Sequence, residues 1–310
     1  MAQLEPWVAN TKRVQAHDIL GGETYQFESV FPDGSPDGTA FSTENMNKII
    51  DAINALPNNN LLLDSHFRLW DEGASFSGAY TSGGYTATLW WVKNLSGGNI
   101  TVSQATGGGM KIQGTGTVQV SQPIEDAQLL NGKAVTLSWS KNGVVSSETY
   151  EFNSSVSNAA TVELTGGGTI NWVKLELGES ATPCVPRPLA QDKQSALRYF
   201  WQTFEGELPS GLGGKMSYTF MADSNGVADA LFCTPVPMYR APTAHHYTET
   251  TGESNQVSVY TRETGHYVTS PNISPFANNC VLGLRLTGCT PNTIGFIAWH
   301  GRYDARMEVT

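Results

Sequence analysis

Short runs of alternating apolar and polar residues fill two long parts of the chain, from about 61 to 177 and from about 205 to 310. Gly and Asn turn signals, such as Asn131-Gly132 and Asn142-Gly143, separate these runs. Alternation with a period of two predicts strands, and closely spaced turns predict antiparallel neighbours. We therefore expect a mainly β protein with a central β-sandwich of the jelly-roll type and a second, C-terminal β domain. Parallel α/β folds are excluded because crossover helices are missing.

One segment near the N-terminus has a helical pattern instead. Its apolar residues recur at intervals of three and four, which predicts a helix from about 43 to 56. Ser42 or Thr43 can cap this helix, and Pro57 ends it. The apolar stripe must pack either on its own domain or on copies of itself around a threefold axis. Its residues are our candidates for oligomerisation or attachment: Met46, Ile49, Ile50 and Ile53.

These patterns divide the chain into four parts. Residues 1–60 form an N-terminal attachment arm, with one short hairpin and the helix, and residues 61–180 form the sandwich. Residues 181–204 are a Pro-rich connector with a short amphipathic helix, and residues 205–310 are the C-terminal, distal β domain. The helix of the connector is predicted from near-helical spacing of its apolar residues, which are Leu189, Leu197, Phe200 and Trp201.

Composition narrows the range of partners. Charged residues make up 15% of the 310 residues, Gly accounts for 32, and the formal net charge is −10. Affinity for nucleic acid comes mainly from Lys and Arg, so we expect neither nucleic acid nor an anionic membrane as a partner of such an acidic chain. No apolar run approaches the roughly 20 residues needed to cross a bilayer, so we expect no membrane insertion.

Motifs for catalysis, cofactors and metals are missing from the sequence. It contains no Gly-x-Ser-x-Gly elbow, His-Glu-x-x-His helix or phosphate loop. Adjacent His245 and His246 point to opposite faces of a strand, so we expect no metal site there, and we expect no cofactor. Loop carboxylates such as Asp71-Glu72 leave a small glycan-degrading enzyme as an alternative. The four cysteines are expected to be free, with a Cys280–Cys289 bridge left open.

Aromatic residues give the main lead to a ligand, because Trp and Tyr rings stack on the apolar faces of sugars. Trp90 and Trp91 are adjacent, so in a strand one faces the core and the other faces outward. Packing in the core or between subunits is the alternative role for each ring. The aromatic residues considered in the sandwich are Trp70, Tyr80, Tyr85, Trp90, Trp91 and Trp139, and those in the C-terminal domain include Tyr247 and Tyr267. We take Trp90, Trp91, Tyr85, Tyr247 and Tyr267 as the glycan- or receptor-contact candidates.

Three stretches together resemble structural proteins of tailed bacteriophages. The first runs from Thr39 to Ile53 (TAFSTENMNKIIDAI), and the second from Asn60 to Trp70 (NLLLDSHFRLW). The third is the most specific and joins WVKLELG at 172–178, ATPCVPRP at 181–188 and RYFW at 198–201. The second and third are similar to the first strand and the exit of a carbohydrate-binding-module-like sandwich. Asp64 stands where this family usually has Asn, and Cys184 where it usually has Phe.

The resemblance implies a non-enzymatic virion component, a tail fibre or receptor-binding subunit that contacts host-surface glycan. It implies a homotrimer, made in the host bacterial cytoplasm, that attaches to other virion proteins at one end. The other end would meet a host surface polysaccharide or an outer-membrane receptor. A location on the tail is favoured over the head, and a head fibre or capsid decoration protein is the alternative.

Overall fold

The structure is a computed structural model in which the chain forms two compact units, Met1–Asn59 and Asn60–Thr310. It describes residues 15–17, 24–26, 60–204, 216–248, 254, 256–261, 267–270 and 273–309. In the first unit, β1 (Gln15–His17) and β2 (Thr24–Gln26) form an antiparallel hairpin. The predicted helix at 43–56, with Met46, Ile49, Ile50 and Ile53, lies outside the described residues.

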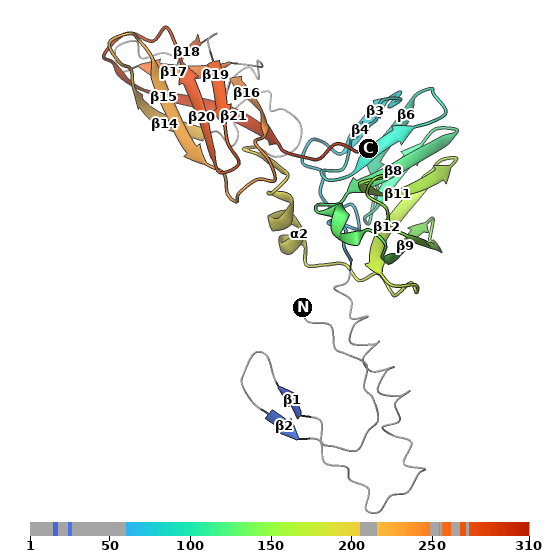
Figure 1. Ribbon diagram of the computed structural model, residues 1–310. Coiled ribbons are helices and arrows are strands. Elements are labelled where there is room, and N and C mark those ends of the chain that lie inside the picture. Colours follow the sequence, from blue (N-terminus) through green and yellow to red (C-terminus); the bar gives the residue numbers. More distant parts are fainter. Residues whose placement is uncertain are drawn as a thin grey trace, which may run out of the picture. The chain divides into compact units, whose positions relative to one another are not determined.

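The second unit begins with a β-sandwich built from two antiparallel sheets (Figure 1). The six-stranded sheet contains, in spatial order, β10 (Val144–Glu151), β9 (Ala134–Lys141), β12 (Gly168–Leu177), β7 (Met110–Gln113), β6 (Ile100–Gln104) and β3 (Ser75–Gly78). The four-stranded sheet contains β11 (Ala159–Thr165), β8 (Thr117–Pro123), β5 (Trp91–Asn94) and β4 (Gly84–Tyr85). The mainly β architecture and the central sandwich are thus as the sequence pattern predicts.

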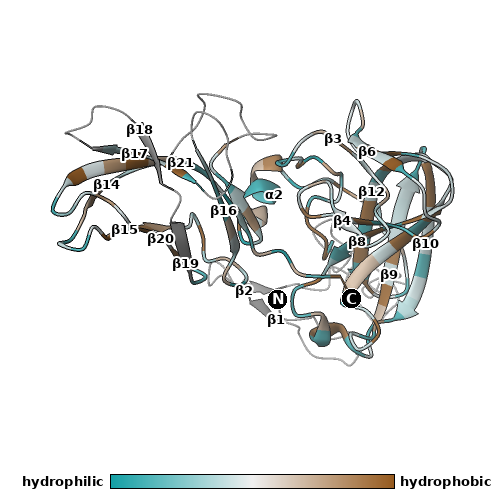
Figure 2. Ribbon diagram, turned by 90° about the horizontal axis from the view of Figure 1, so that it is seen from above, coloured by the Kyte–Doolittle hydropathy of each residue, from teal (hydrophilic) through white to brown (hydrophobic). Residues whose placement is uncertain are grey.

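Alternation along the strands builds the core of the sandwich. In β8, Val118 and Val120 are buried between the sheets, whereas Gln119 points to the outer face. Figure 2 shows the same change between hydrophobic and hydrophilic colour along the sandwich strands. Each buried methylene group adds roughly 0.8 kcal/mol to the free energy of unfolding. The face of a strand that carries the apolar side chains is therefore the face that turns toward the core.

The Asn142-Gly143 turn joins β9 to β10 with two residues. Asn142 has φ 52° and Gly143 has φ 80°, the pair of positive values that a type I′ turn requires. Such a turn matches the twist of its strands, and the register pairs Val144 with Lys141 and continues without a break to Glu151 and Ala134. A long, regular hairpin results.

The C-terminal part of the unit contains two further sheets, and the larger one is organised around one long strand, β21 (Ile294–Asp304). Four shorter strands pair with β21, two along each edge: β13 (Phe200–Gln202), β14 (Met216–Met221), β16 (Thr243–Thr248) and β17 (Val257–Thr261). The strand β18 (Tyr267–Ser270) extends this sheet beyond β17. The second sheet contains β15 (Ala228–Cys233), β20 (Val281–Leu286) and β19 (Ile273–Ala277).

A separate hydrophobic core lies between these two sheets. Trp299 and Tyr303 of β21 are fully buried, and their rings contact Phe232 of β15. The indole N–H of Trp299 donates a hydrogen bond to the Tyr303 hydroxyl over 3.1 Å, which satisfies a polar atom that would otherwise be buried without a partner. The described residues therefore contain two cores in one compact unit.

The connector between the two β domains holds a shorter helix than we expected. The helix α2 spans Leu189–Ala196, and the chain then enters β13, which pairs with the C-terminal end of β21. The prediction that Phe200 and Trp201 continue an amphipathic helix was therefore wrong. Pairing with β21 and burial of Phe200 outweigh the helical spacing, which is a local signal only.

A buried ion pair fastens the exit of the sandwich. Lys174 and Glu176 stand two residues apart on β12, so they share its outer face, yet both are almost fully buried. The Lys174 Nζ lies 2.8 Å from a Glu176 carboxylate oxygen and also donates to the Thr182 hydroxyl. Thr182 in turn donates its hydroxyl and its backbone N–H to Glu176, at 2.6 and 2.8 Å. The three groups satisfy one another and hold the connector on the sheet.

The first residues of the sandwich are tied to the same place. The Asn60 amide oxygen accepts the backbone N–H of Leu175 over 3.1 Å, and Arg187 of the connector donates to the Asn60 carbonyl. Arg68 pairs with Asp192 on α2 at 2.6 Å. The stretches 60–70 and 172–188 and the helix α2 therefore meet at one junction, where the chain enters and leaves the sandwich.

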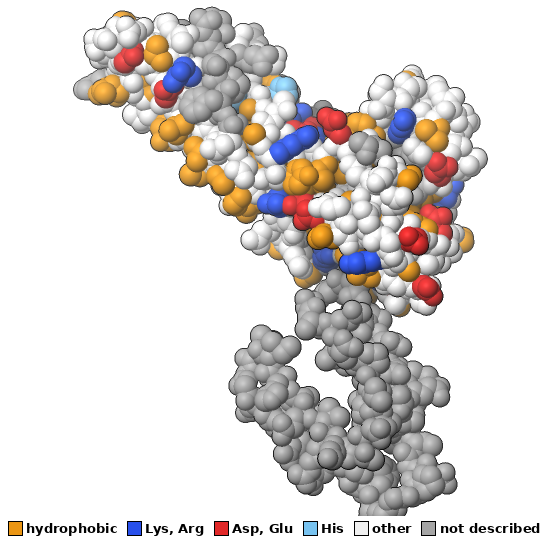
Figure 3. Space-filling view, viewed as in Figure 1, with side chains coloured by type: hydrophobic (Ala, Val, Ile, Leu, Met, Phe, Trp, Pro, Cys, Tyr) orange, Lys and Arg blue, Asp and Glu red, His pale blue; other side chains and the backbone are white. Residues whose placement is uncertain are grey.

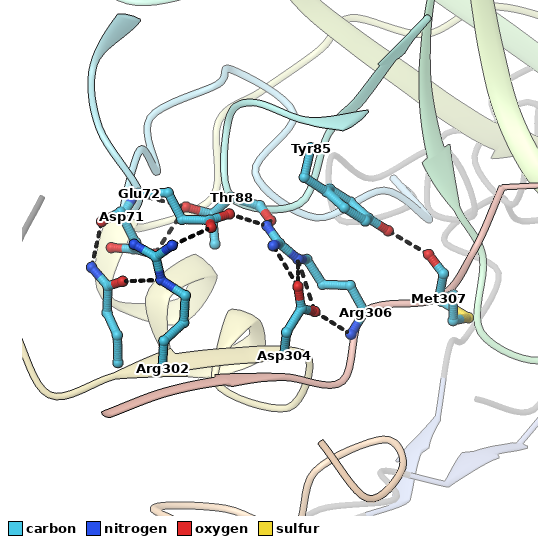
Figure 4. A network of polar contacts seen from close by, with 9 residues as sticks. Asp71, Glu72, Tyr85, Thr88, Arg302, Asp304, Arg306 and Met307 are labelled. Carbon is cyan, nitrogen blue, oxygen red and sulfur yellow. Dashed lines mark hydrogen bonds and ion pairs between the residues drawn. The ribbon is translucent and has the colours of Figure 1, made fainter. Parts of the chain in front are cut away.

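Arg306 joins the sandwich to the C-terminal domain (Figure 4). Its guanidinium is 2.7 Å from Glu72 of the sandwich and 2.6 Å from Asp304 of β21. It also lies between two rings, with its centre 4.1 Å from the Tyr85 ring and 4.4 Å from the Phe200 ring. A planar cation can use both faces for rings and its edge for carboxylates, which explains how a charge is accommodated at a site only 6% exposed.

The residues after β21 run back along the sandwich, as Figure 1 shows for the C-terminal end. The Tyr85 hydroxyl donates to the Met307 carbonyl over 2.6 Å, and the Asn158 amide donates to the Glu308 carbonyl over 2.8 Å. Arg302 adds an ion pair with Glu72 at 3.2 Å. The last strand and the tail thus fasten the second β domain onto the first.

Removing one partner of the buried ion pair should be far more damaging than removing both. We expect Glu176→Leu to lower the free energy of unfolding by about 3–5 kcal/mol, because Lys174 would keep a buried charge without its counter-charge. The double variant Lys174→Met, Glu176→Leu should regain most of that loss. Urea denaturation measures both values, and equal stabilities of the single and double variants would contradict the assignment.

Asp64, near the same junction, generates a pH dependence. Burial raises its pKa from 3.8 to about 7, against the opposing effect of the backbone N–H groups of Leu69 and Arg68. The folded state then binds the proton more strongly than the unfolded state between these values. Stability from this group is full below about pH 4 and falls as the pH rises to about 7, by roughly 4 kcal/mol.

The Asp64 carboxyl should therefore titrate near neutral pH when followed by NMR. Exposed Asp223 is an internal reference in the same spectra, because backbone N–H groups, chiefly that of Val227, lower its pKa. Asp64→Asn should flatten the dependence of stability on pH between about 4 and 7. A carboxyl of Asp64 that titrates near 4 would show that burial does not control it.

Candidate functional site

A groove of about 720 Å³ lies over the outer face of the four-stranded sheet and continues past its edge. Both aromatic and hydrogen-bonding side chains line it. The residues of its wall are Ser82, Trp91, Lys93, Gln119, Ser121, Trp139, Glu148, Ser157, Thr161, Glu163 and Val309. We call this feature the Trp91 groove.

The strand register arranges the floor of the Trp91 groove in rows that cross the sheet. Trp91 of β5 lies opposite Ser121 of β8, and Ser121 lies opposite Thr161 of β11. The Ser121 and Thr161 hydroxyls are 2.8 Å apart. One row therefore presents an indole and the half-buried Thr161 hydroxyl, with the buried Ser121 hydroxyl between them, on strands that are about 4.8 Å apart.

A second row runs beside the first. Lys93, two residues beyond Trp91, lies opposite Gln119, and Gln119 lies opposite Glu163. The Gln119 amide donates to the Glu163 carboxylate over 2.7 Å, which orients both groups. This row presents an ammonium, an amide and a carboxylate, so the floor carries both donors and acceptors of hydrogen bonds.

Of the two adjacent tryptophans, Trp90 is the one in the core. It is fully buried, its ring contacts Phe67, and its indole N–H donates to the Asp64 carbonyl over 3.1 Å. Trp91 is half-buried on the outer face and lines the groove. The Trp91 ring packs directly on Gly83. A Cβ atom at Gly83 would lie only 2.2 Å from the indole nitrogen, so no larger residue fits there without a shift of the ring.

The far side of the groove comes from the six-stranded sheet. Trp139 of β9 is half-buried and packs on the edge of the core, and Glu148 of the neighbouring strand β10 is exposed. Both line the groove with Thr161 and Glu163 of β11. The groove is thus bordered by an aromatic residue at each side, with polar groups between.

Of the other predicted contact residues, two are taken up by packing within the protein. Tyr85 is held by Arg306 and Met307 at the interdomain joint, and burial raises the pKa of its hydroxyl well above the usual range. Tyr247 is 7% exposed, with its ring against Phe204, so it does not face a surface ligand. Tyr267 lies in β18, but its side chain is outside the described residues, as are Met46, Ile49, Ile50 and Ile53.

The residues that sequence reasoning missed are the polar ones of the groove. The sequence analysis named none of Gln119, Ser121, Thr161 and Glu163 as a contact residue. Their alternation with buried Val and Leu residues is visible in the sequence. The order of the strands, which brings them beside Trp91, is not.

A second, smaller pocket of about 360 Å³ lies beside the interdomain joint. Its wall is mostly apolar, and Tyr199 of the connector and Arg306 and Met307 of the C-terminal domain close it; the apolar residues include Leu61, Leu63, Leu89, Leu129 and Leu130. It has few hydrogen-bonding groups in comparison with the Trp91 groove. We assign it to the packing of the joint.

Metal and thiol chemistry find little support in the described parts of the chain. No three His, Cys, Asp or Glu residues gather there in a way that could hold a metal ion. His245 is exposed whereas His246 is buried, and burial lowers the pKa of His246 to about 4. The four cysteines are free thiols, and Cys280 and Cys289 form no bridge.

Two further observations concern the surface and the helices of the described residues. Figure 3 shows mostly uncharged side chains and backbone on this face of the described residues, with acidic and basic groups scattered among them. Among those same residues, no helix combines the length and apolar character that a bilayer span requires.

Comparison with known proteins adds no relative to this picture. No family model and no curated protein matches the sequence. The chemistry of the groove and the resemblance described above are therefore the basis for a functional assignment.

Proposed function

We propose that this chain is a non-enzymatic glycan-binding subunit of a tailed-phage virion, and that the Trp91 groove is where it contacts glycan. The observation that supports this most is the combination of Trp91 with a row of hydroxyls on a rigid sheet. Ser121 and Thr161 extend from the ring at strand spacing, and Gln119 and Glu163 lie beside them.

Sugars need two kinds of contact, and the groove offers both. The C–H face of a pyranose ring stacks on an aromatic ring, while its hydroxyls exchange hydrogen bonds with side chains that both donate and accept. Trp91 supplies the first contact, and Gln119, Thr161 and Glu163 supply the second, while buried Ser121 orients the Thr161 hydroxyl. Because the side chains stand on paired strands, little conformational entropy is lost when they bind.

The virion assignment is carried by sequence resemblance. The stretches 60–70 and 172–188 that carry it lie together at one junction of the sandwich. We propose a tail fibre or receptor-binding subunit, with other virion proteins and a host surface polysaccharide or outer-membrane receptor as partners. Antibodies against the chain should label the tails of intact particles in electron microscopy, whereas labelling of heads would favour a capsid decoration protein.

Truncation of Trp91 should weaken glycan binding. On an array of bacterial capsule and lipopolysaccharide oligosaccharides, we expect Trp91→Ala to lose at least about tenfold in affinity for whichever glycan the unchanged chain binds, since tenfold corresponds to about 1.4 kcal/mol of lost stacking. Tyr218→Ala is the matched control, because Tyr218 is 41% exposed and lies in the other domain. An unchanged affinity of the Trp91 variant, with an unchanged melting temperature, would remove the groove from this role.

A second candidate function comes from the two carboxylates of the groove. Glu148 and Glu163 both line it, and pairs of carboxylates cleave glycosidic bonds in hydrolases. Both side chains are exposed, whereas the general acid of such enzymes lies in a dry, apolar pocket. We therefore favour binding, and expect no new reducing ends when the chain is incubated with glycans that it binds. Release that disappears in Glu148→Gln would establish hydrolysis instead.

A further inference from the structure

The strand β10 leaves a long edge of the sandwich open. It is the outermost strand of the six-stranded sheet and pairs with β9 along all eight of its residues, without a bulge. Val144 and Val145 are 68% and 60% exposed. Natural edge strands are usually short, bulged, or protected by charged residues or Pro. The strand β10 is long and unbulged and has no Lys or Pro, and its charged residues are Glu148 and Glu151.

The other edges of the sandwich are less suited to pairing. The strands β3 and β4 have only four and two residues. The strand β11 is longer, but its exposed residues are Glu163 and Thr165, and its apolar residues are buried. Among the edge strands of the sandwich, β10 therefore combines a long, regular edge with exposed apolar side chains.

Half of the backbone groups of β10 point away from its own sheet. Residues that flank a two-residue turn form a hydrogen-bonded pair, so Val144 and Ser146 direct their N–H and C=O groups toward β9. Val145, Ser147 and Thr149 then direct theirs toward the open edge. A further antiparallel strand can hydrogen-bond to these three residues.

We propose that β10 pairs with β10 of a second copy of this chain, antiparallel and around a twofold axis at Ser147. In this register Val144 lies opposite Tyr150 of the second copy, and Val145 opposite Thr149. Ser146 lies opposite Glu148, and Ser147 opposite its own equivalent. The six-stranded sheets of the two copies join into one.

The side chains select this register. It places a β-branched residue opposite an aromatic one, and a hydroxyl that can donate opposite a carboxylate, both of which are favourable cross-strand pairs. An axis at Glu148 would set two carboxylates against each other. An axis at Ser146 would set Val144 against Glu148, so neither neighbour of the Ser147 register is equally complementary.

The pairing also bears on the Trp91 groove. Glu148 lines the groove, and in the pair it lies beside Ser146 of the second copy. The second copy therefore contributes to the open side of each groove. The contact is separate from any association through Met46, Ile49, Ile50 and Ile53, and it holds whether or not the groove binds glycan.

A charge on the twofold axis tests the proposal. Ser147→Glu places two carboxylates opposite each other, and we expect it to halve the mass of the full chain in analytical ultracentrifugation, whatever assembly the N-terminal residues support. Ser155→Glu is the matched control, since Ser155 is exposed in the loop after β10 and adds the same charge outside the pair. A mass that Ser147→Glu leaves unchanged overturns the proposal.

A cross-link provides a second test that does not depend on loss of structure. Cysteines at facing positions of paired strands lie within reach of a disulfide. Under mild oxidation Ser147→Cys should give a dimer band that is absent from Ser155→Cys and from the unchanged chain, which carries the native thiols. Equal bands in all three would overturn the twofold pairing.

Discussion

Burial of the Lys174–Glu176 pair is the constraint on which the arrangement of this protein depends. Two opposite charges on the outer face of β12 are enclosed only because the connector lies over them, with Thr182 bound to both. If the connector left the sheet, the pair would be hydrated, but the hydrogen bond from Arg187 to the Asn60 carbonyl would be lost as well. The ion pair therefore determines where the chain leaves the sandwich.

From this junction the second β domain follows. Arg68 holds α2 through Asp192, and the chain continues into β13 and its pairing with β21. Just beyond the same end of β21, Arg306 brings the chain back to the sandwich, with its guanidinium between the Tyr85 and Phe200 rings. Two domains with separate cores are thus held together at two places, by Arg68 and Asp192 at the connector and by Arg306 after β21. At both places the charged groups are largely buried together with their partners.

The Trp91 groove uses the rigidity of this arrangement. Its floor stands on paired strands of one sheet, and its far side comes from β9 and β10 of the other sheet. A rigid, polar floor with a tryptophan at each side is suited to holding a sugar chain by stacking and hydrogen bonds. The open edge of β10 borders the same groove. The proposed ligand site and the proposed contact between copies would therefore lie side by side.

Local patterns determined much of this protein. Period-two alternation predicted the strands and the mainly β fold, and Asn142-Gly143 predicted the hairpin, because side-chain direction and turn geometry are properties of a few neighbouring residues. Alternation also required that Trp90 and Trp91 face opposite ways. Only the tertiary structure decided which of them is buried, that Tyr247 is covered, and that Phe200 and Trp201 form a strand. It also decided that Lys174 and Glu176, two charged residues, lie inside. The physical reason is that spacing along the chain specifies the faces of a strand, whereas the order of strands in the sheets decides what covers each face.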